Sequence, residues 1–331
     1  MHVHRRFLGW GVFFILLGAI PLAVQAGLLT AAQVADWWRF WPLILVGIGL
    51  GLLLRRTSFE GLGGLVVAAT FGVMFGAAAS SGLAGIGGFP GGVCGPLDHA
   101  TAFPGQNGTF DSPSVDVEVR LDCGEVTIAS DDGAGWQVTG DSGSGRGPRI
   151  EADTSSLTIH SAPGDRGPFD WTGMREDWVI TLPNAPRTTL DAQVNAGTSR
   201  MDLAGATIDT LGLELNAATS TVDLSATRTV AELDIQLNAG SLGLMLPATG
   251  TTGTIEANAG SVKLCAPAGV ALRLETEDSV LGSFDYGGHG LVHVGSTWES
   301  PGFDTAAVRV DLSTTGNLAS FQLDPAEGCG G

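Results

Sequence analysis

Four versions of one repeat decide the fold of this chain: Asn195-Ala-Gly-Thr-Ser-Arg-Met-Asp-Leu203, Asn216-Ala-Ala-Thr-Ser-Thr-Val-Asp-Leu224, Asn238-Ala-Gly-Ser-Leu-Gly-Leu-Met-Leu246 and Asn258-Ala-Gly-Ser-Val-Lys-Leu-Cys-Ala266. Their first residues are 21, 22 and 20 positions apart. A fixed period in this range is typical of a solenoid, in which each coil buries its apolar face by stacking on its neighbours. We therefore predict a single-stranded, right-handed β-helix with coils of about 20–22 residues.

Each repeat has the pattern of two short strands that meet at a corner of small residues. Leu211, Leu213 and Leu215 recur at every second position before the corner, which is typical of a half-buried strand. Asparagine suits a corner because its amide bonds local backbone and tolerates a left-handed conformation. Stacked amides favour a structural ladder over a ligand-binding role. The predicted corners are Asn195, Asn216, Asn238 and Asn258.

Weaker alternation extends the predicted solenoid to residues 113–326, followed by a tail at 327–331. Residues 282–303 break the period, and we predict a cap or a side excursion there, because an open solenoid end recruits other chains. Residues 308–312 and 318–323 are predicted to be the final pair of strands. The predicted early coils contain residues 126–128, 157–159 and 179–182.

Residues 1–88 are intensely apolar, and we predict that they form a membrane anchor of three transmembrane helices. A bilayer core needs about 20 helical residues, and no charge occurs between Gly61 and Leu97. The predicted helices cover about residues 7–29, 37–54 and 61–87, and a Gly/Pro-rich neck covers residues 89–112.

Arginine placement predicts the orientation of this anchor in a bacterial cytoplasmic membrane. Arg5-Arg6 precede the first predicted helix, and Arg55-Arg56 lie between the second and third. Arginine-rich segments stay in the cytoplasm, so we expect the N-terminus inside and everything after about residue 90 outside. An alternative is a cleaved signal peptide over residues 1–26, because Val24-Gln25-Ala26 is similar to a cleavage site.

The formal net charge of −18 is the sum of +3 for residues 1–97 and −21 for the part of the chain after residue 97. This acidic part argues against binding to nucleic acid, whose phosphates it would repel. It also argues against docking on anionic lipid. Solubility is the simplest reason for the excess of carboxylates, and no motif in the sequence requires a cofactor.

All four cysteines follow the last predicted helix, on the oxidising side of the membrane. Their even number predicts disulfides with three possible connectivities. We prefer Cys94–Cys123 and Cys265–Cys329, because each pair would lie near one end of the solenoid. Since the chain has no Cys-x-x-Cys motif, zinc binding and dithiol chemistry are not expected.

Residues 163–178 are the least repeat-like part of the predicted solenoid. Phe169, Trp171 and Trp178 stand there among charged residues. Aromatic and charged side chains on a loop suit a contact surface. The same aromatic residues would also suit packing over the end of a coil, so both interpretations stay open for this segment.

Two short motifs suggest chemistry but have better structural explanations. Gly140-Asp-Ser-Gly143 matches the surroundings of a serine-protease nucleophile, which also needs a histidine and a carboxylate. The only upstream histidine outside the predicted anchor is His99, inside the neck, so a turn explains this motif better. His289 and His293 would lie about 13 Å apart on a strand, too far for one metal.

Acidic residues recur along the repeats, where stacked carboxylates could hold calcium. The glycine-rich nonapeptide of calcium-binding β-helices is absent, so a solvated outer face is the favoured interpretation. The residues concerned are Asp191, Asp202, Asp209, Asp223 and Asp234.

Two parts of the chain resemble bacterial families. The stretch Trp37-Trp-Arg-Phe-Trp-Pro-Leu-Ile-Leu-Val-Gly-Ile-Gly-Leu-Gly-Leu-Leu-Leu-Arg55 is similar to the transmembrane hairpin of LiaF/LiaI-type proteins. The Asn-Ala-Gly-Ser repeats resemble the "putative adhesin" families, which share the C-terminal β-solenoid of LiaF-like proteins. This resemblance implies a role in the envelope-stress response, in some members by restraint of a sensor kinase.

We therefore expect a non-enzymatic, membrane-anchored protein of the cell envelope. It would bind or scaffold envelope components, or signal stress through a partner in the same membrane. A cell-surface adhesin is the alternative. A polysaccharide-acting β-helix enzyme is a further one, and it would need carboxylates clustered on adjacent coils.

Overall fold

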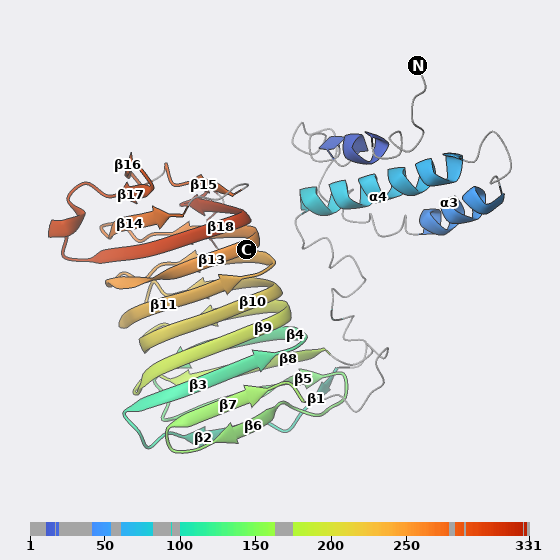
Figure 1. The fold of residues 1–331 in the computed structure, drawn as a ribbon. Helices are drawn as coiled ribbons and strands as arrows, with labels where there is room; N and C mark the ends of the chain where they lie inside the picture. Colours follow the sequence, from blue (N-terminus) through green and yellow to red (C-terminus); the bar gives the residue numbers. More distant parts are fainter. Residues whose placement is uncertain are drawn as a thin grey trace. The chain divides into compact units, whose positions relative to one another are not determined.

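The computed structural model of this protein describes residues 11–16, 18–19, 42–53, 61–81, 94, 100–162, 175–277, 282–287, 289–326 and 328–329. The chain divides into two compact units, Met1–Val93 and Cys94–Gly331 (Figure 1).

The first unit contains helices α3 (Pro42–Leu53) and α4 (Gly61–Ser81). A Cβ added at Gly63 of α4 would clash with the backbone of Gly47 and Gly51 in α3, so the two helices approach through small residues. Both lie within ranges predicted to cross the membrane, whereas the predicted helix over residues 7–29 falls mostly outside the described residues. No described helix combines the length and the apolar character that a membrane crossing requires.

The second unit is all-β, as the sequence predicts. Its regular elements other than a short 3₁₀ helix at Phe303–Thr305 are strands β1 (Thr101–Ala102), β2 (Gln106–Thr109), β3 (Ser114–Leu121), β4 (Gly124–Asp131), β5 (Gly135–Ser142), β6 (Arg149–Ala152), β7 (Ser156–His160), β8 (Glu176–Pro183), β9 (Arg187–Asp202), β10 (Thr207–Asp223), β11 (Thr229–Leu237), β12 (Gly240–Met245), β13 (Thr251–Cys265), β14 (Ala271–Thr276), β15 (Ser283–Asp285), β16 (Val292–Val294), β17 (Thr297–Glu299) and β18 (Arg309–Leu323).

Most of these strands lie parallel in one long stack of rungs (Figure 1). A rung has a leading segment before the corner and a trailing segment after it. In the leading segments, Leu211 of β10 stands in register with Leu190 of β9 and Leu233 of β11. All three side chains are at most 1% exposed. The repeat period therefore brings equivalent apolar side chains together in the core.

The order of the rungs in space differs from their order in the sequence at both ends of the stack. β3 pairs with β7 on one side and with β9 on the other. β18, the last strand of the chain, pairs with both β13 and β14. The predicted final strands at residues 308–312 and 318–323 are thus one strand inside the stack, not its end. A parallel strand can pair with any other strand that has the same alternation of inward and outward side chains. The repeat period in the sequence therefore does not determine which rungs are neighbours in space.

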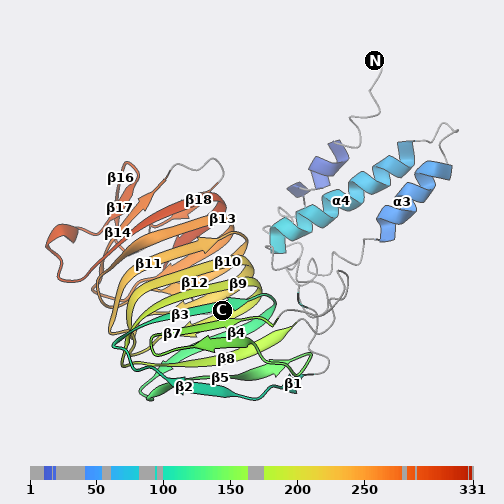
Figure 2. The same ribbon diagram turned by 60° about the horizontal axis from the view of Figure 1, so that its bottom comes forward.

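Antiparallel strands cover the outer edges of the stack (Figure 2). At one end, β5 pairs with β8 and β6 pairs with β7. At the other end, β17 pairs with β14 and β16 pairs with β17. The segment 282–303, which the sequence predicts as a cap or excursion, contains β15, β16 and β17. These short strands shorten the unpaired edge that would otherwise recruit another chain.

An aromatic cluster fills the core near β18. The Phe284 and Phe321 rings stack with centroids 5.1 Å apart, and Trp298 meets Tyr286 edge to face at 6.2 Å. The Tyr286 hydroxyl donates to Thr314 Oγ1 at 3.1 Å, and burial raises the pKa of Tyr286. Its buried polar atom is therefore satisfied inside the core.

Candidate functional site

Asparagine side chains at the corners form a hydrogen-bonded column along the stack. Asn216 Nδ2 donates to Asn195 Oδ1 at 2.8 Å, and Asn238 Nδ2 donates to Asn216 Oδ1 at 2.7 Å. Asn258 Nδ2 continues the column by donating to Asn238 Oδ1 at 2.8 Å. Every amide donates in the same direction, so the interior amides use both a donor and an acceptor between rungs.

Two residues that the sequence did not predict end this column. Asn195 Nδ2 donates to Asp122 Oδ1 at 3.0 Å, and Asn317 Nδ2 donates to Asn258 Oδ1 at 2.7 Å. An ionised carboxylate only accepts hydrogen bonds, so Asp122 is a natural end for a row of donors. Asn317 is followed by Leu-Ala-Ser rather than Ala-Gly-Ser, which hides it from a search for the repeat.

Replacing Asn238 with alanine should lower the free energy of unfolding by about 1–2 kcal/mol, because two bonds of the column are lost. Asn317→Ala is the matched control, since it loses one described bond at the exposed end of the column and should cost about half as much. Urea unfolding of the full chain, followed by circular dichroism, measures both. Equal and negligible effects would show that the column does not stabilise the stack.

The cysteines form two disulfide bonds, Cys94–Cys123 and Cys265–Cys329, which span 29 and 64 residues. The first joins the start of the second unit to the corner between β3 and β4. The second holds the C-terminal segment across β12, where the carbonyl oxygen of Cys329 occupies the space that a side chain at Gly243 would need. Closing loops of this length stabilises the folded chain by about 3–4 kcal/mol each.

For Trp178 the structure shows packing, which is one of the two interpretations that the sequence left open for residues 163–178. Its side chain is 1% exposed and belongs to the core beneath β8. It therefore packs inside the stack and is not available as a contact residue. Phe169 and Trp171, the other two aromatic residues of that segment, lie outside the described residues.

A buried carboxyl group lies close to Trp178 in the sequence. Glu176 is 6% exposed, and its Oε2 atom has no hydrogen-bond partner among the residues that the structure describes. Burial raises the pKa of Glu176 above its ordinary value, and hydrogen bonds from Ser161 and Ala162 oppose this rise.

The motifs tested for chemistry have structural roles. Ser142 is buried, and its Oγ atom donates to the carbonyl of Arg146 at 2.8 Å within a turn. His289 Nδ1 lies 2.7 Å from Asp324 Oδ2, whereas the His293 ring stacks on Trp298 at 4.1 Å. The described residues include no group of three or more His, Cys, Asp or Glu side chains placed to hold a metal ion.

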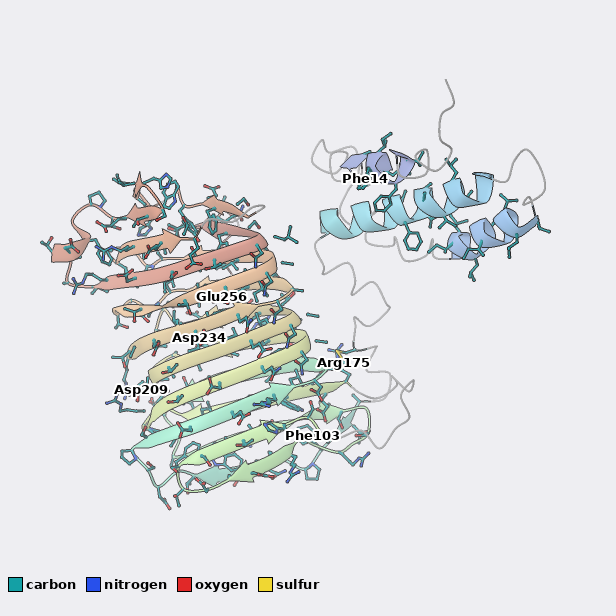
Figure 3. All side chains as sticks on the ribbon, in the orientation of Figure 1. Phe14, Phe103, Arg175, Asp209, Asp234 and Glu256 are labelled. Carbon is teal, nitrogen blue, oxygen red and sulfur yellow. A yellow bond between two sulfur atoms is a disulfide. The ribbon has the colours of Figure 1, made fainter. Side chains whose placement is uncertain are left out.

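The outward side chains of the leading segments form an acidic face. Its arginines are already engaged: Arg120 binds Glu118 at 2.6 Å, Arg187 binds Asp209 at 2.6 Å, and Arg273 contacts Glu299 at 2.6 Å and Asp304 at 2.9 Å. Arg309 donates to the carbonyl of Asp304 at 3.3 Å. Figure 3 labels Asp234 and Glu256 among its carboxylates. The acidic face consists of Asp116, Glu118, Asp191, Glu214, Glu232, Asp234, Glu256, Glu275 and Asp311.

Asp191 lies at the most crowded point of the acidic face. Partial burial raises its pKa first, and repulsion from Glu118, Asp116 and Asp234 raises it further. Gly212 stands beside it in register on β10, and its missing side chain leaves the space that Asp191 Oδ1 occupies. Like charges therefore stand close together around Asp191, although Arg120 binds its neighbour Glu118.

The remaining aspartates of the predicted acidic series have local roles. Asp209 binds Arg187 at 2.6 Å. Asp202 and Asp223 each accept a backbone N–H two residues ahead, at 3.2 Å and 2.9 Å. On the trailing segments, one row of outward positions carries hydroxyl groups, whereas the next row includes Arg200, Thr221 and Lys263. The row of hydroxyl groups consists of Thr198, Thr219, Ser241, Ser261 and Ser320.

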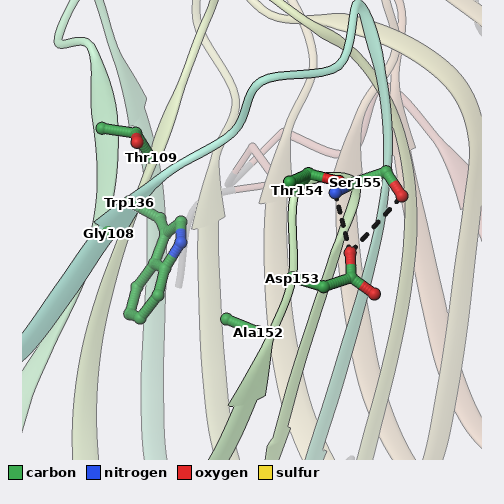
Figure 4. Close-up of a pocket in the computed structure, with 7 residues that line it drawn as sticks. All are labelled: Gly108, Thr109, Trp136, Ala152, Asp153, Thr154 and Ser155. Atoms are coloured by element: carbon green, nitrogen blue, oxygen red, sulfur yellow. Dashed lines mark hydrogen bonds between the residues drawn. The ribbon is translucent and has the colours of Figure 1, made fainter.

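A shallow cleft of about 480 Å³ lies among β2, β5 and the turn between β6 and β7. Trp136 forms one side of it, and Asp153 and its turn form the other (Figure 4). Nothing in the sequence marks this cleft, because its walls come from segments that are well separated along the chain.

Residues 9–97 match the family described as the LiaF transmembrane domain, and residues 106–245 match the N-terminal domain of toast_rack, DUF2154. Over these two segments the chain is thus similar to a LiaF transmembrane domain followed by the N-terminal domain of toast_rack. The resemblance inferred from the sequence is thus confirmed. The two matches support a membrane-associated protein of the cell envelope.

Two solved structures are similar to the chain at low sequence identity. One is a putative cell adhesion protein from Clostridium sporogenes ATCC 15579, with 12% identity, a TM-score of 0.43, and coverage of 66% of this chain and 98% of that one. The other is a putative adhesin from Bacteroides fragilis NCTC 9343, with 10% identity, a TM-score of 0.27, and coverage of 66% and 96%. No curated protein matches the chain.

Proposed function

We propose that this protein is a non-enzymatic scaffold of the cell envelope, anchored in the cytoplasmic membrane and docking a basic segment of a membrane partner on its acidic face. The observation that carries the proposal is the acidic face itself, a regular array of carboxylates on stacked strands. A field of one sign attracts an oppositely charged partner and speeds its association. Restraint or relay of an envelope-stress signal is the role that this arrangement suits.

The membrane anchor is supported by the first unit. Leu45, Leu52 and Leu53 of α3 are 58%, 68% and 82% exposed, and exposed apolar side chains of this kind suit a lipid or protein environment. In this proposal the N-terminus is cytoplasmic and the toast-rack domain is extracytoplasmic. The two disulfides agree with an oxidising location for that domain.

The described cleft lacks the carboxyl pair that a polysaccharide-acting enzyme would need. Glycoside hydrolysis needs a pair of carboxyl groups that flank one bond, about 5–9.5 Å apart. Asp153 is the only carboxylate among the residues that line the described cleft. The cell-surface adhesin remains the alternative function, and the partner test separates it from signalling.

Photo-cross-linking in intact membranes tests the proposed docking. A benzophenone amino acid at Thr254, beside Asp234 on the acidic face, should trap a membrane protein. The same probe at Thr221, on a trailing segment, is the matched control and should not trap it. The adduct should disappear when Asp234 and Glu256 are both replaced by lysine. Adducts of equal yield from both positions, or an adduct unaffected by these replacements, would contradict docking on the acidic face.

A further inference from the structure

We propose that the cleft between Trp136 and Asp153 is a binding subsite for one residue of a neutral saccharide. The inference does not depend on a membrane partner. Three separate segments build the cleft: β2 supplies Gly108 and Thr109, β5 supplies Trp136, and the β6–β7 turn supplies Asp153 and its neighbours (Figure 4). Its volume of about 480 Å³ falls within the range of small-molecule sites.

The indole of Trp136 is held rigidly but keeps its N–H unused. The side chain is 6% exposed, and Gly108 lies so close to the ring that a Cβ there would meet Nε1 at 2.9 Å. Among the described residues Nε1 has no hydrogen-bond partner, and it is not one of the fully enclosed polar atoms. Figure 4 shows the nitrogen-bearing edge of the ring on the side where Asp153 lies. A buried indole N–H usually has a hydrogen-bond partner, so this one is available to a polar group of a ligand.

Asp153 lies across the cleft from Trp136 (Figure 4). Oδ1 accepts the backbone N–H groups of Ser155 at 2.8 Å and Ser156 at 2.7 Å, and these bonds lower the pKa of Asp153. The carboxylate is therefore ionised and fixed by its own turn. Both backbone bonds use Oδ1, and Oδ2 points away from them (Figure 4), where it can accept a hydrogen bond from a ligand.

These groups select a neutral polyol over a charged ligand. An anion would be repelled by Asp153. An ammonium group would find one solvent-exposed carboxylate, and such a pair contributes only about 0–1 kcal/mol, while the indole N–H would oppose it donor to donor. A hydroxyl group both donates and accepts, so neighbouring sugar hydroxyls can donate to Oδ2 and accept from Nε1. The side-chain hydroxyls of Thr109 and Thr154 can either donate a hydrogen bond to the sugar or accept one from it.

The cleft is suited to binding without cleavage. Its single carboxylate provides no acid–base pair across a glycosidic bond. Its open, shallow form fits a residue within a polymer better than an enclosed small molecule. The end of the stack would thereby attach to a glycan, whereas the acidic face would remain available to a protein.

Saturation-transfer NMR and calorimetry on the full-length protein test this assignment. The protein is kept in lauryldimethylamine oxide, because sugar-based detergents would compete for the cleft. Chitotriose, cellotriose and maltotriose serve as neutral probes, and tetralysine serves as the cationic one. We expect at least one trisaccharide to bind and tetralysine not to compete with it.

Three variants locate the binding. Trp136→Phe removes the donor and should weaken trisaccharide binding about threefold or more. Asp153→Asn keeps the Oδ1 acceptor of the turn but replaces the free oxygen, and should weaken binding about tenfold. Asp223→Asn is the matched control, because Asp223 Oδ1 accepts from Ser225 in an equivalent turn outside the cleft, and its binding should be unchanged.

The proposal is overturned if no trisaccharide binds, if tetralysine displaces the bound sugar, or if Asp153→Asn and Asp223→Asn bind equally well. If Trp136→Phe does not fold, the affinities of Asp153→Asn and Asp223→Asn for the trisaccharide still test the proposal. Both of these variants preserve the hydrogen bonds of their turns.

Discussion

Truncation of Leu312 to alanine is expected to lower the free energy of unfolding by about 2–5 kcal/mol and to loosen rungs on both sides of β18. Leu312 is 0% exposed and stands in register between Gly253 of β13 and Leu274 of β14. The loss combines the transfer of a buried side chain with the cavity that it leaves. Because each rung of a solenoid is stabilised by its direct neighbours, the damage should extend to β14, which precedes β18 in the sequence.

Urea unfolding and hydrogen exchange of the full chain measure this effect. Leu318→Ala is the matched control, since Leu318 lies on the same strand and is 61% exposed; it should cost about 0.5 kcal/mol or less. Faster exchange in β14 of Leu312→Ala is the decisive observation. If β14 stays as protected as in the unchanged protein, β18 does not lie between β13 and β14 in solution.

Replacement of Gly240 by alanine is expected to destabilise the stack by at least about 3 kcal/mol. Gly240 follows a corner asparagine and has φ of 129°, a conformation that costs other residues about 1–3 kcal/mol. A Cβ at this position would also overlap the carbonyl oxygen of Ala218 on the neighbouring rung. Strain and overlap act on the same residue, so neither can relax without moving the corner.

Gly269→Ala separates the two causes. Gly269 also has a positive φ, of 88°, but no atom lies within 4 Å of its added Cβ. It should cost only the conformational strain, about 1–2 kcal/mol. Thermal and urea unfolding of both variants give the comparison. Ala218 stands in register with Gly240 on the neighbouring rung and has no positive φ. Equal losses would mean that the Gly240 corner can adopt the conformation of the Ala218 corner.

The residue pattern predicted those features that depend on neighbours in the same or the next coil. Alternation from Leu211 to Leu215 indicates which side chains face inward, because a strand exposes its two faces in turn. The asparagine spacing marks the positions where the column is now seen. Asp122 and Asn317 escaped notice because one is a carboxylate and the other lacks the Ala-Gly sequence, yet each fills an end of the same column.

The core position of Trp178 and the cleft could not be predicted in this way. The aromatic and charged composition of residues 163–178 allowed a contact surface, but Trp178 is needed to fill the core beneath β8. The cleft escaped prediction because Gly108, Trp136 and Asp153 belong to different strands and turns. Only the folded chain brings the indole donor and the carboxylate to opposite sides of one space (Figure 4).

The sequence by itself determined that the chain after its apolar N-terminal region forms stacked β-coils with asparagine corners, because the period, the alternation and the corner residues all act over short distances. The tertiary structure alone decided the order of the rungs and the place of β18 between β13 and β14. The physical reason is that parallel strands with the same inward pattern can pair with many rungs equally well. Which neighbour each rung takes depends on the end strands, the disulfides and the core packing of the whole unit.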